Sequence, residues 1–418
     1  MREIESAFRT EIHRYALNGK SHTANARDIS IPTALVPVVS GIVALNDFPL
    51  RKPPTVIPQT NFSDGSHGIS PNDFATIYHV LPLWNSAGID GAGQSIAIVG
   101  QSNINLTDIS SFRSQFGLPA NNPEVVLNGP DPGLRNGDQD EAELDVEWAG
   151  AVAKGAKITL VASASTNASV GVFLSATYIV NNNVAPIVSL SYGFCEAVTS
   201  TSVYMGNLWQ QAAAQGMSVF VASGDSGSAG CESSSASTAT RGFGVDGAAS
   251  SPYSVAVGGT EFDEGGNDPA YWNTSNGPNA TSVKGYIPEV VWNDAGGELA
   301  SSGGGVSLTW STPRWQTGYG VPTEDPGAPN QHHRYITDVS LAASAKHDGY
   351  VLRLNDALYS AGGTSVSAPA FAGIMAMINQ FSRARPMAIQ IRASMRLPHR
   401  LLQYFMTSFP ARTPSPAE

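Results

Sequence analysis

Residues 361–369 read AGGTSVSAP, and a run of mostly small and apolar residues follows them as far as Gln380. The two glycines let the chain turn tightly, and a proline is tolerated near the first turn of a helix. The pattern therefore predicts a buried helix whose N-terminal end points at Ser365. The partial positive charge of such an end favours the oxyanion that forms when a hydroxyl attacks a carbonyl, so Ser365 is a candidate nucleophile. A serine that only caps a core helix is the competing interpretation.

The composition is that of a globular protein with many turns. The chain has 418 residues, of which 42% are hydrophobic and only 14% charged, together with 42 glycines and 27 prolines. A net charge of −11 without a basic stripe argues against a nucleic acid partner. We expect no membrane span, because no apolar run approaches the roughly 20 residues that one needs. The length allows one large domain and a smaller one.

From residue 70 onward, short apolar runs alternate with segments of helical spacing. The apolar runs are 95–100, 156–162, 187–192, 217–222 and 253–258, and the helical segments between them are 141–152, 172–181 and 203–214. This alternation predicts an α/β fold, a doubly wound parallel sheet that helices cover on both faces. In such sheets, the functional site lies beyond the carboxyl ends of the strands.

Two acidic segments are candidates for that site. Glu141 and Asp145 lie one helical turn apart and share a face, and like charges so placed destabilise a helix unless something uses them. Asp225 lies in the loop SGDSG, directly after the apolar run 217–222. The competing interpretations are a solvated acidic first turn for the former segment and an ordinary turn for the latter.

The three motifs are, in chain order, the segment with Glu141 and Asp145, the loop with Asp225 and the stretch 361–369. Together they resemble the motifs of the sedolisin (serine-carboxyl) peptidases, which share a fold with the subtilisins. The resemblance covers residues 1 to about 380 and implies that Ser365 is the nucleophile, Glu141 the general base and Asp145 the residue that orients the base. Asp225 would keep its proton and stabilise the oxyanion as a donor. We therefore expect a subtilisin-like fold and an acid-acting, secreted serine-carboxyl endopeptidase that works through an acyl-enzyme. A subtilisin-type triad is not expected, because no histidine opens the acidic helix.

The same resemblance implies substrate-binding residues and a disulfide. The residues that it assigns to substrate binding are Ser189, Ser191, Gly193, Ser223 and Gly224. Cys195 and Cys231 flank segments that resemble the active-site region of secreted peptidases, so a disulfide is one expectation and two free buried thiols are the other. Neither cysteine has a Cys or His at metal-ligand spacing, and no residue is predicted to bind a metal.

The chain divides into four parts by composition and resemblance. These are a small α+β remnant of an activation prodomain similar to that of the pro-kumamolisins (1–50), a linker with a maturation cleavage zone (51–69), the catalytic domain (70–380) and an off-pattern basic tail (381–418). Within the remnant, the spacing predicts a helix from Ile4 to Tyr15. The opening residues MREIE lack an apolar core segment, so a secreted protein would lack its signal peptide in this chain.

Calcium is the cofactor that the resemblance implies, bound by carboxylates and carbonyl groups of a C-terminal loop. Glu418 is the only acidic residue after Asp356, so we expect this ligand segment to be absent. The expected partners are polypeptide substrates and the chain's own prodomain, and the expected state is a monomer. Because the C-terminal segment departs from the family pattern, an inactive or binding-only peptidase-like protein is the alternative function.

Overall fold

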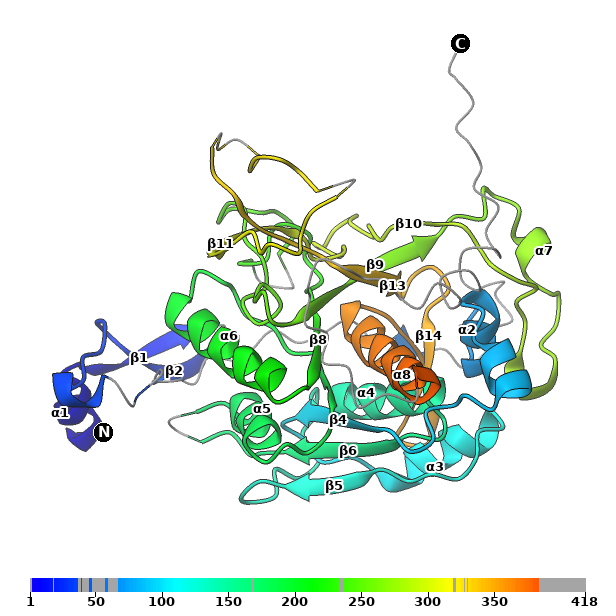
Figure 1. Cartoon of the computed structure of the whole chain (residues 1–418), viewed down its shortest axis with the longest axis horizontal. Coiled ribbons are helices and arrows are strands. Elements are labelled where there is room, and N and C mark those ends of the chain that lie inside the picture. The colour runs from blue at the N-terminus through cyan, green and yellow to red at the C-terminus, as the bar shows by residue number, and fades with distance from the viewer. Residues whose placement is uncertain are drawn as a thin grey trace, which may run out of the picture.

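The N-terminal unit is a short helix followed by a hairpin. The computed structural model describes residues 2–17, 19–36, 39, 45–46, 57–58, 67–166, 169–232, 236–318, 321–326, 328 and 330–382. Helix α1 (Arg2–Phe8) precedes the antiparallel strands β1 (Ile12–Leu17) and β2 (Lys20–Asn25), and a 3₁₀ turn, η1 (Thr33–Leu35), follows. Figure 1 shows α1, β1 and β2 at one end of the molecule.

The single helix predicted from Ile4 to Tyr15 is therefore wrong beyond Phe8. The sequence pair Asn18-Gly19 strongly favours a two-residue hairpin turn, and Gly19 adopts the left-handed conformation, with φ of 74°. The turn allows residues on both sides of it to pair as strands. The local turn signal outweighs the helical spacing of the apolar residues.

The larger unit is built on an eight-stranded sheet with the order β10-β9-β8-β7-β4-β6-β5, in which β13 also pairs with β9. Only the pairing of β10 with β9 is antiparallel. The strands are β4 (Ser95–Gly100), β5 (Glu124–Leu127), β6 (Lys157–Ala162), β7 (Ile187–Leu190), β8 (Ser218–Ala222), β9 (Val255–Phe262), β10 (Glu289–Val291) and β13 (Val339–Ala342). The predicted parallel sheet is confirmed.

Helices cover both faces of this sheet (Figure 1). They are α3 (Leu106–Gln115), α4 (Gln139–Val152), α5 (Gly171–Asn181), α6 (Thr199–Ala214) and α8 (Thr364–Ser382). Alternate side chains of β4 show the two layers, because Ala97 and Val99 join the core that includes α5 and α6, whereas Ile96 and Ile98 join the core that includes α4 and α8. The doubly wound α/β class predicted from the alternation is confirmed.

The remaining elements surround this core. They are α2 (Pro71–Ile77), the π-helical turn η3 (Leu83–Ala87), α7 (Asp268–Tyr271), the 3₁₀ turn η4 (Pro278–Ala280), the pair β11 (Gly305–Ser311) and β12 (His333–Ile336), and the hairpin β14 (Tyr350–Leu354) and β15 (Ala357–Ala361), with which β3 (Ile57–Pro58) pairs. Strand β3 lies within the predicted linker. Most of that linker and nearly all of the predicted tail lie outside the described residues, so the domain boundaries remain predictions.

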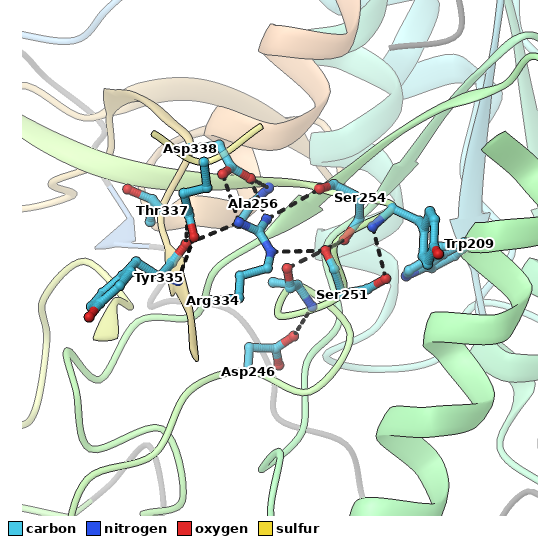
Figure 2. A network of polar contacts seen from close by, with 12 residues as sticks. Trp209, Asp246, Ser251, Ser254, Ala256, Arg334, Tyr335, Thr337 and Asp338 are labelled. Carbon is cyan, nitrogen blue, oxygen red and sulfur yellow. Dashed lines mark hydrogen bonds and ion pairs between the residues drawn. The ribbon is translucent and has the colours of Figure 1, made fainter. Parts of the chain in front are cut away.

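A buried arginine network holds β13 beside β9. Arg334 is fully buried and donates from two nitrogens to the carboxylate of Asp338, at 2.6 and 2.9 Å. It also donates to the carbonyl oxygens of Ser251 and Ser254 (Figure 2). Asp338 in turn accepts from the backbone N–H of Ala256 at 2.8 Å. A buried ion pair is stable only when its remaining donors and acceptors are satisfied, and this one has such partners on three segments.

Candidate active site

Ser365 lies in the first turn of α8, beyond a turn that only glycine permits. A Cβ at Gly362 would lie 2.3 Å from the carbonyl oxygen of Ala343, and Gly363 has φ of 100°. The helix begins at Thr364, so Ser365 is inside the helix and is not its cap. Its side chain is almost fully buried, and its hydroxyl donates to the carbonyl oxygen of Ser191 at 3.3 Å.

Glu141 and Asp145 lie on α4, which packs directly against α8 (Figure 1). The close approach of the two helices depends on Gly373, where a Cβ would lie 2.7 Å from Cβ of Val152. Glu141 is 4% exposed and Asp145 is fully buried, so the interpretation of a solvated acidic turn is excluded. Oε1 of Glu141 and Oδ2 of Asp145 have no hydrogen-bond partner. Each carboxyl group thus keeps an oxygen in the interior that nothing in the described structure uses.

Ser191 contacts both halves of the predicted site. Its hydroxyl lies 2.7 Å from Oδ1 of Asp145 and 3.1 Å from the carbonyl oxygen of Ser365. A hydroxyl has one proton to donate, and the shorter contact with a carboxylate is the stronger one. Ser191 thus joins α4 to the turn that carries Ser365. The hydrogen bond expected between Ser365 and Glu141 is not formed within the described residues and stays a prediction for the substrate-bound enzyme.

Burial dominates the electrostatics of the pair. Burial raises the pKa of Glu141 well above its usual value, and the charges of Asp145, Asp140 and Asp225 raise it further. Burial also raises the pKa of Asp145, whereas the hydrogen bond from Ser191 lowers it. Two neighbouring buried carboxyl groups cannot both ionise cheaply, so the pair retains a proton at a pH where exposed carboxyl groups have lost theirs.

Asp225 lies in the loop after β8 and is fastened to the start of α8. Its Oδ1 accepts from the backbone N–H of Thr364 at 2.8 Å and from the hydroxyl of Thr364 at 2.9 Å. That hydroxyl accepts from the N–H of Gly224 at 3.1 Å. Because the charge of Asp225 contributes to the raised pKa of Glu141, the two carboxyl groups belong to the same electrostatic environment. The structure therefore brings Glu141, Asp145, Asp225 and Ser365 together from three distant segments.

The residues predicted to bind substrate fall into two groups. Ser189 lies inside β7, where Ile98 and Phe220 are its partners on the two neighbouring strands. It therefore offers no free strand edge to a peptide. Ser191 and Gly193 lie beyond the end of β7, and a Cβ at Gly193 would lie 2.1 Å from Oδ2 of Asp246.

The other predicted substrate-binding residues, Ser223 and Gly224, pack against the glycine run of residues 303–305. The hydroxyl of Ser223 donates to the carbonyl oxygen of Gly303 at 2.8 Å, and the N–H of Gly303 donates to the carbonyl oxygen of Gly224. A Cβ at Gly303 would lie 2.1 Å from the carbonyl oxygen of Ser223. These contacts fix the backbone on either side of Asp225.

Cys195 and Cys231 form a disulfide, so the alternative of two free thiols is excluded. Cys195 follows Gly193 closely in the chain, and Cys231 follows the loop that carries Asp225. The bond therefore ties together the segments that follow β7 and β8, the two strands whose ends lead into the site.

The hydrogen-bonding role of Ser191 is the part of the site that sequence reasoning missed. The serine was singled out for its place on the substrate strand, and no local pattern indicates that its hydroxyl contacts Asp145. The acid lies on a helix far away in the chain, so only the packing of α4 and α8 around β7 reveals the contact.

The comparisons with known proteins agree with this architecture. The family described as "Pro-kumamolisin, activation domain" matches residues 1–48. Sedolisin of Pseudomonas sp. (strain 101) is 29% identical over 394 residues, which is 90% of this chain and 62% of that protein. Kumamolisin of Bacillus sp. (strain MN-32) is 30% identical over 393 residues, 90% of this chain and 65% of that protein. The chain thus spans less than two thirds of these relatives.

A solved structure gives the same result for the fold. Pseudomonas sedolisin, a serine-carboxyl proteinase in complex with two molecules of pseudo-iodotyrostatin, superposes with a TM-score of 0.61 at 27% identity, covering 77% of this chain and 84% of that one. The parallel sheet and the matched activation segment both make this chain similar to peptidases that carry an activation domain. Within that class, the chain is a homologue of the sedolisin (serine-carboxyl) peptidases.

Proposed function

We propose that this protein is a serine-carboxyl peptidase that hydrolyses peptide bonds in acid through an acyl-enzyme on Ser365. The observation that carries the proposal is the buried contact of Ser191 with both Asp145 and Ser365, next to a Glu141 oxygen that has no partner. Glu143 and Glu147 of the same helix also keep an oxygen without a partner among the described residues, so what sets Asp145 apart is that its partner Ser191 also contacts Ser365. Buried carboxyl groups beside a serine hydroxyl in the first turn of a helix suit proton exchange with a substrate.

In the proposed reaction, Ser365 turns from the carbonyl of Ser191 toward Glu141. Its Oγ bonds to the substrate carbonyl carbon, and its proton passes to Glu141. The carboxyl group of Asp225, protonated, and the N-terminal end of α8 stabilise the oxyanion. Glu141 then gives the proton to the departing amine, and the C–N bond breaks.

Hydrolysis of the ester repeats these steps with water. Glu141 takes a proton from the water, the hydroxide bonds to the acyl carbon, and the proton returns to Oγ of Ser365 as the ester bond breaks. Asp145 orients Glu141 throughout and is itself held by Ser191. The scheme needs an ionised Glu141 and a protonated Asp225 at the same pH, which is the reason for proposing activity below neutrality.

We further propose that polypeptides and the chain's own prodomain are the partners, that the protein acts as a monomer and that it acts outside the cell. The disulfide between Cys195 and Cys231 supports the location, because disulfides persist in oxidising compartments. Among the described helices, none is long and apolar enough to cross a bilayer.

The test is acylation of the full chain by activated peptide esters at pH 4, followed by intact mass and peptide mapping. We expect one acyl group per chain, located on Ser365, and none on the Ser365→Ala variant. A well-folded chain that binds the ester without forming an adduct would overturn the proposal in favour of a binding-only protein.

A further inference from the structure

A second cluster of polar side chains lies away from Ser365, where three loops meet. Glu264 follows β9, His347 and Asp348 precede β14, and His67 precedes α2. One ligand atom from each of Glu264, His347 and Asp348 lies within 4.8 Å of the others. None of these residues belongs to the proposed catalytic machinery.

The distances show a convergent arrangement. Nε2 of His347 is 3.6 Å from Oε2 of Glu264, and its Nδ1 is 3.3 Å from Oδ2 of Asp348. On the other side, Nδ1 of His67 is 3.4 Å from Oδ1 of Asp348. Oε1 of Glu264 accepts from the indole N–H of Trp272 at 3.2 Å, and the ring of His67 stacks on Trp272 with 4.6 Å between ring centroids. The outer contacts hold both His67 and Glu264 in place.

The charge of the cluster is not compensated by a permanent cation. The side chains of Glu264 and Asp348 are 3% and 8% exposed. Within the part of the chain that the structure describes, no lysine or arginine pairs with either carboxylate. Two buried carboxyl groups side by side need either a shared proton or a cation, because the cost of removing two carboxylates from water is otherwise not offset.

We propose that Glu264, His347 and Asp348 bind a divalent first-row transition ion, with Zn²⁺ as the best fit. One imidazole and two carboxylates in a buried site form a set that zinc accepts, with three protein ligands and a fourth position for water or His67. Calcium fits less well, since it takes six to eight oxygen ligands. His347 is 49% exposed, so its ring can turn one nitrogen from a carboxylate toward the ion.

Such an ion would fasten the start of the catalytic unit. The N–H of His67 donates to Asp348, the N–H of Ile69 donates to the carbonyl of Gly349, and the N–H of Val351 donates to the carbonyl of Ile69. The last residues of the predicted linker thus pair with residues 349–351 at the start of β14. A metal bound at Asp348 would stabilise this pairing and the folded state by the free energy of binding.

The experiment uses the full chain, stripped with a chelator and titrated with ZnCl₂ at pH 7.5, with thermal melting and calorimetry as readouts. We expect one tight zinc per chain, a rise in Tm that EDTA reverses, and no comparable rise with CaCl₂. The variants His347→Asn and Glu264→Gln should each weaken zinc binding at least about tenfold. The exposed His332→Ala is the matched control and should bind zinc as the wild type does.

Substitution of Co²⁺ gives an independent readout that does not depend on how stable the variants are. The intense visible bands of four-coordinate Co²⁺ should appear with the wild type and be lost on addition of zinc. Absence of a zinc-dependent rise in Tm, or equal binding by His347→Asn, would overturn the proposal and leave His347 as an ion-pair partner of the two carboxylates.

Discussion

The two acidic faces of helix α4 are alike in burial and differ in what they touch. One face carries Glu141 and Asp145, and the other carries Glu143 and Glu147. All four side chains are almost fully buried, and each has one oxygen atom without a hydrogen-bond partner in the part of the chain that the structure describes. Burial is the largest cause of the raised pKa in every case. Neither burial nor a raised pKa therefore distinguishes a proposed catalytic carboxyl group from a structural one in this helix.

The partners of the other oxygens distinguish them. Glu143 accepts from the backbone N–H of Asn105 at 2.8 Å, and Glu147 accepts from that of Arg353 at 3.1 Å. Both therefore hold neighbouring segments, the start of α3 and strand β14, against α4. Asp145 instead accepts from a side-chain hydroxyl that also contacts the backbone of Ser365. Glu143 also accepts from the side chain of Gln139, so we propose that the link through Ser191 to Ser365 is what marks the face used for chemistry.

The largest expected effect separates the two faces by activity. Glu141→Gln removes the proposed base and should lower kcat by about 10²- to 10⁴-fold on a pool of quenched fluorescent peptides. Glu143→Gln keeps an amide oxygen for the N–H of Asn105 and should change kcat only a few-fold. Equal losses in both variants, at equal Tm, would show that the comparison of the two faces is wrong.

The second effect is a change in protein stability with pH, and it arises from the face of α4 that carries Glu143 and Glu147. Burial raises the pKa of Glu143 to about 7 from 4.5, and the charges of Asp108 and Asp140 add to the shift. Because the folded-state pKa is the higher one, the stabilisation is complete below pH 4.5 and is lost as pH rises through 7. The loss is worth about 3 kcal/mol. Glu147, next to Glu143, Asp108 and Arg353, acts in the same direction.

Urea unfolding at pH 4.5 and pH 8 measures this loss. Between these two pH values, the free energy of unfolding should fall less for the Glu143→Gln variant than for the wild type. The half-exposed Glu124, which pairs with Lys157, provides the control, and Glu124→Gln should leave the wild-type loss unchanged. A wild type that is more stable at pH 8 would contradict the assignment.

The smallest effect tests Ser191 as a positioning residue. Ser191→Ala removes the hydroxyl that lowers the pKa of Asp145, so kcat should fall about tenfold and the acid limb of the pH profile should move to higher pH. Ser189→Ala is the matched control, because the buried hydroxyl of Ser189 has no hydrogen-bond partner among the described residues. If Ser191→Ala lowers kcat without moving the limb, Ser191 supports the fold only.

Much of the fold was predictable because its signals are local. Apolar, β-branched runs at the positions of β4, β6, β7 and β8 predict buried parallel strands, and helical spacing predicts α4, α5 and α6. The N-terminal hairpin was missed because its first strand, Ile12–Leu17, overlaps the segment from Ile4 to Tyr15, whose apolar spacing resembles that of a helix. Strands such as β10 and β13 were missed because edge strands are short and lack a continuous apolar run.

By itself, the sequence determined that this chain forms a helix-covered parallel sheet and that a serine stands at a glycine turn before a buried helix. Both follow from near-neighbour chemistry, the burial of alternating apolar residues and the freedom of Gly362 and Gly363. Only the tertiary structure decided which acids of α4 face Ser191 and that Glu264 meets His347. Such contacts join residues far apart in the chain, and they depend on how helices and loops pack, which no local period encodes.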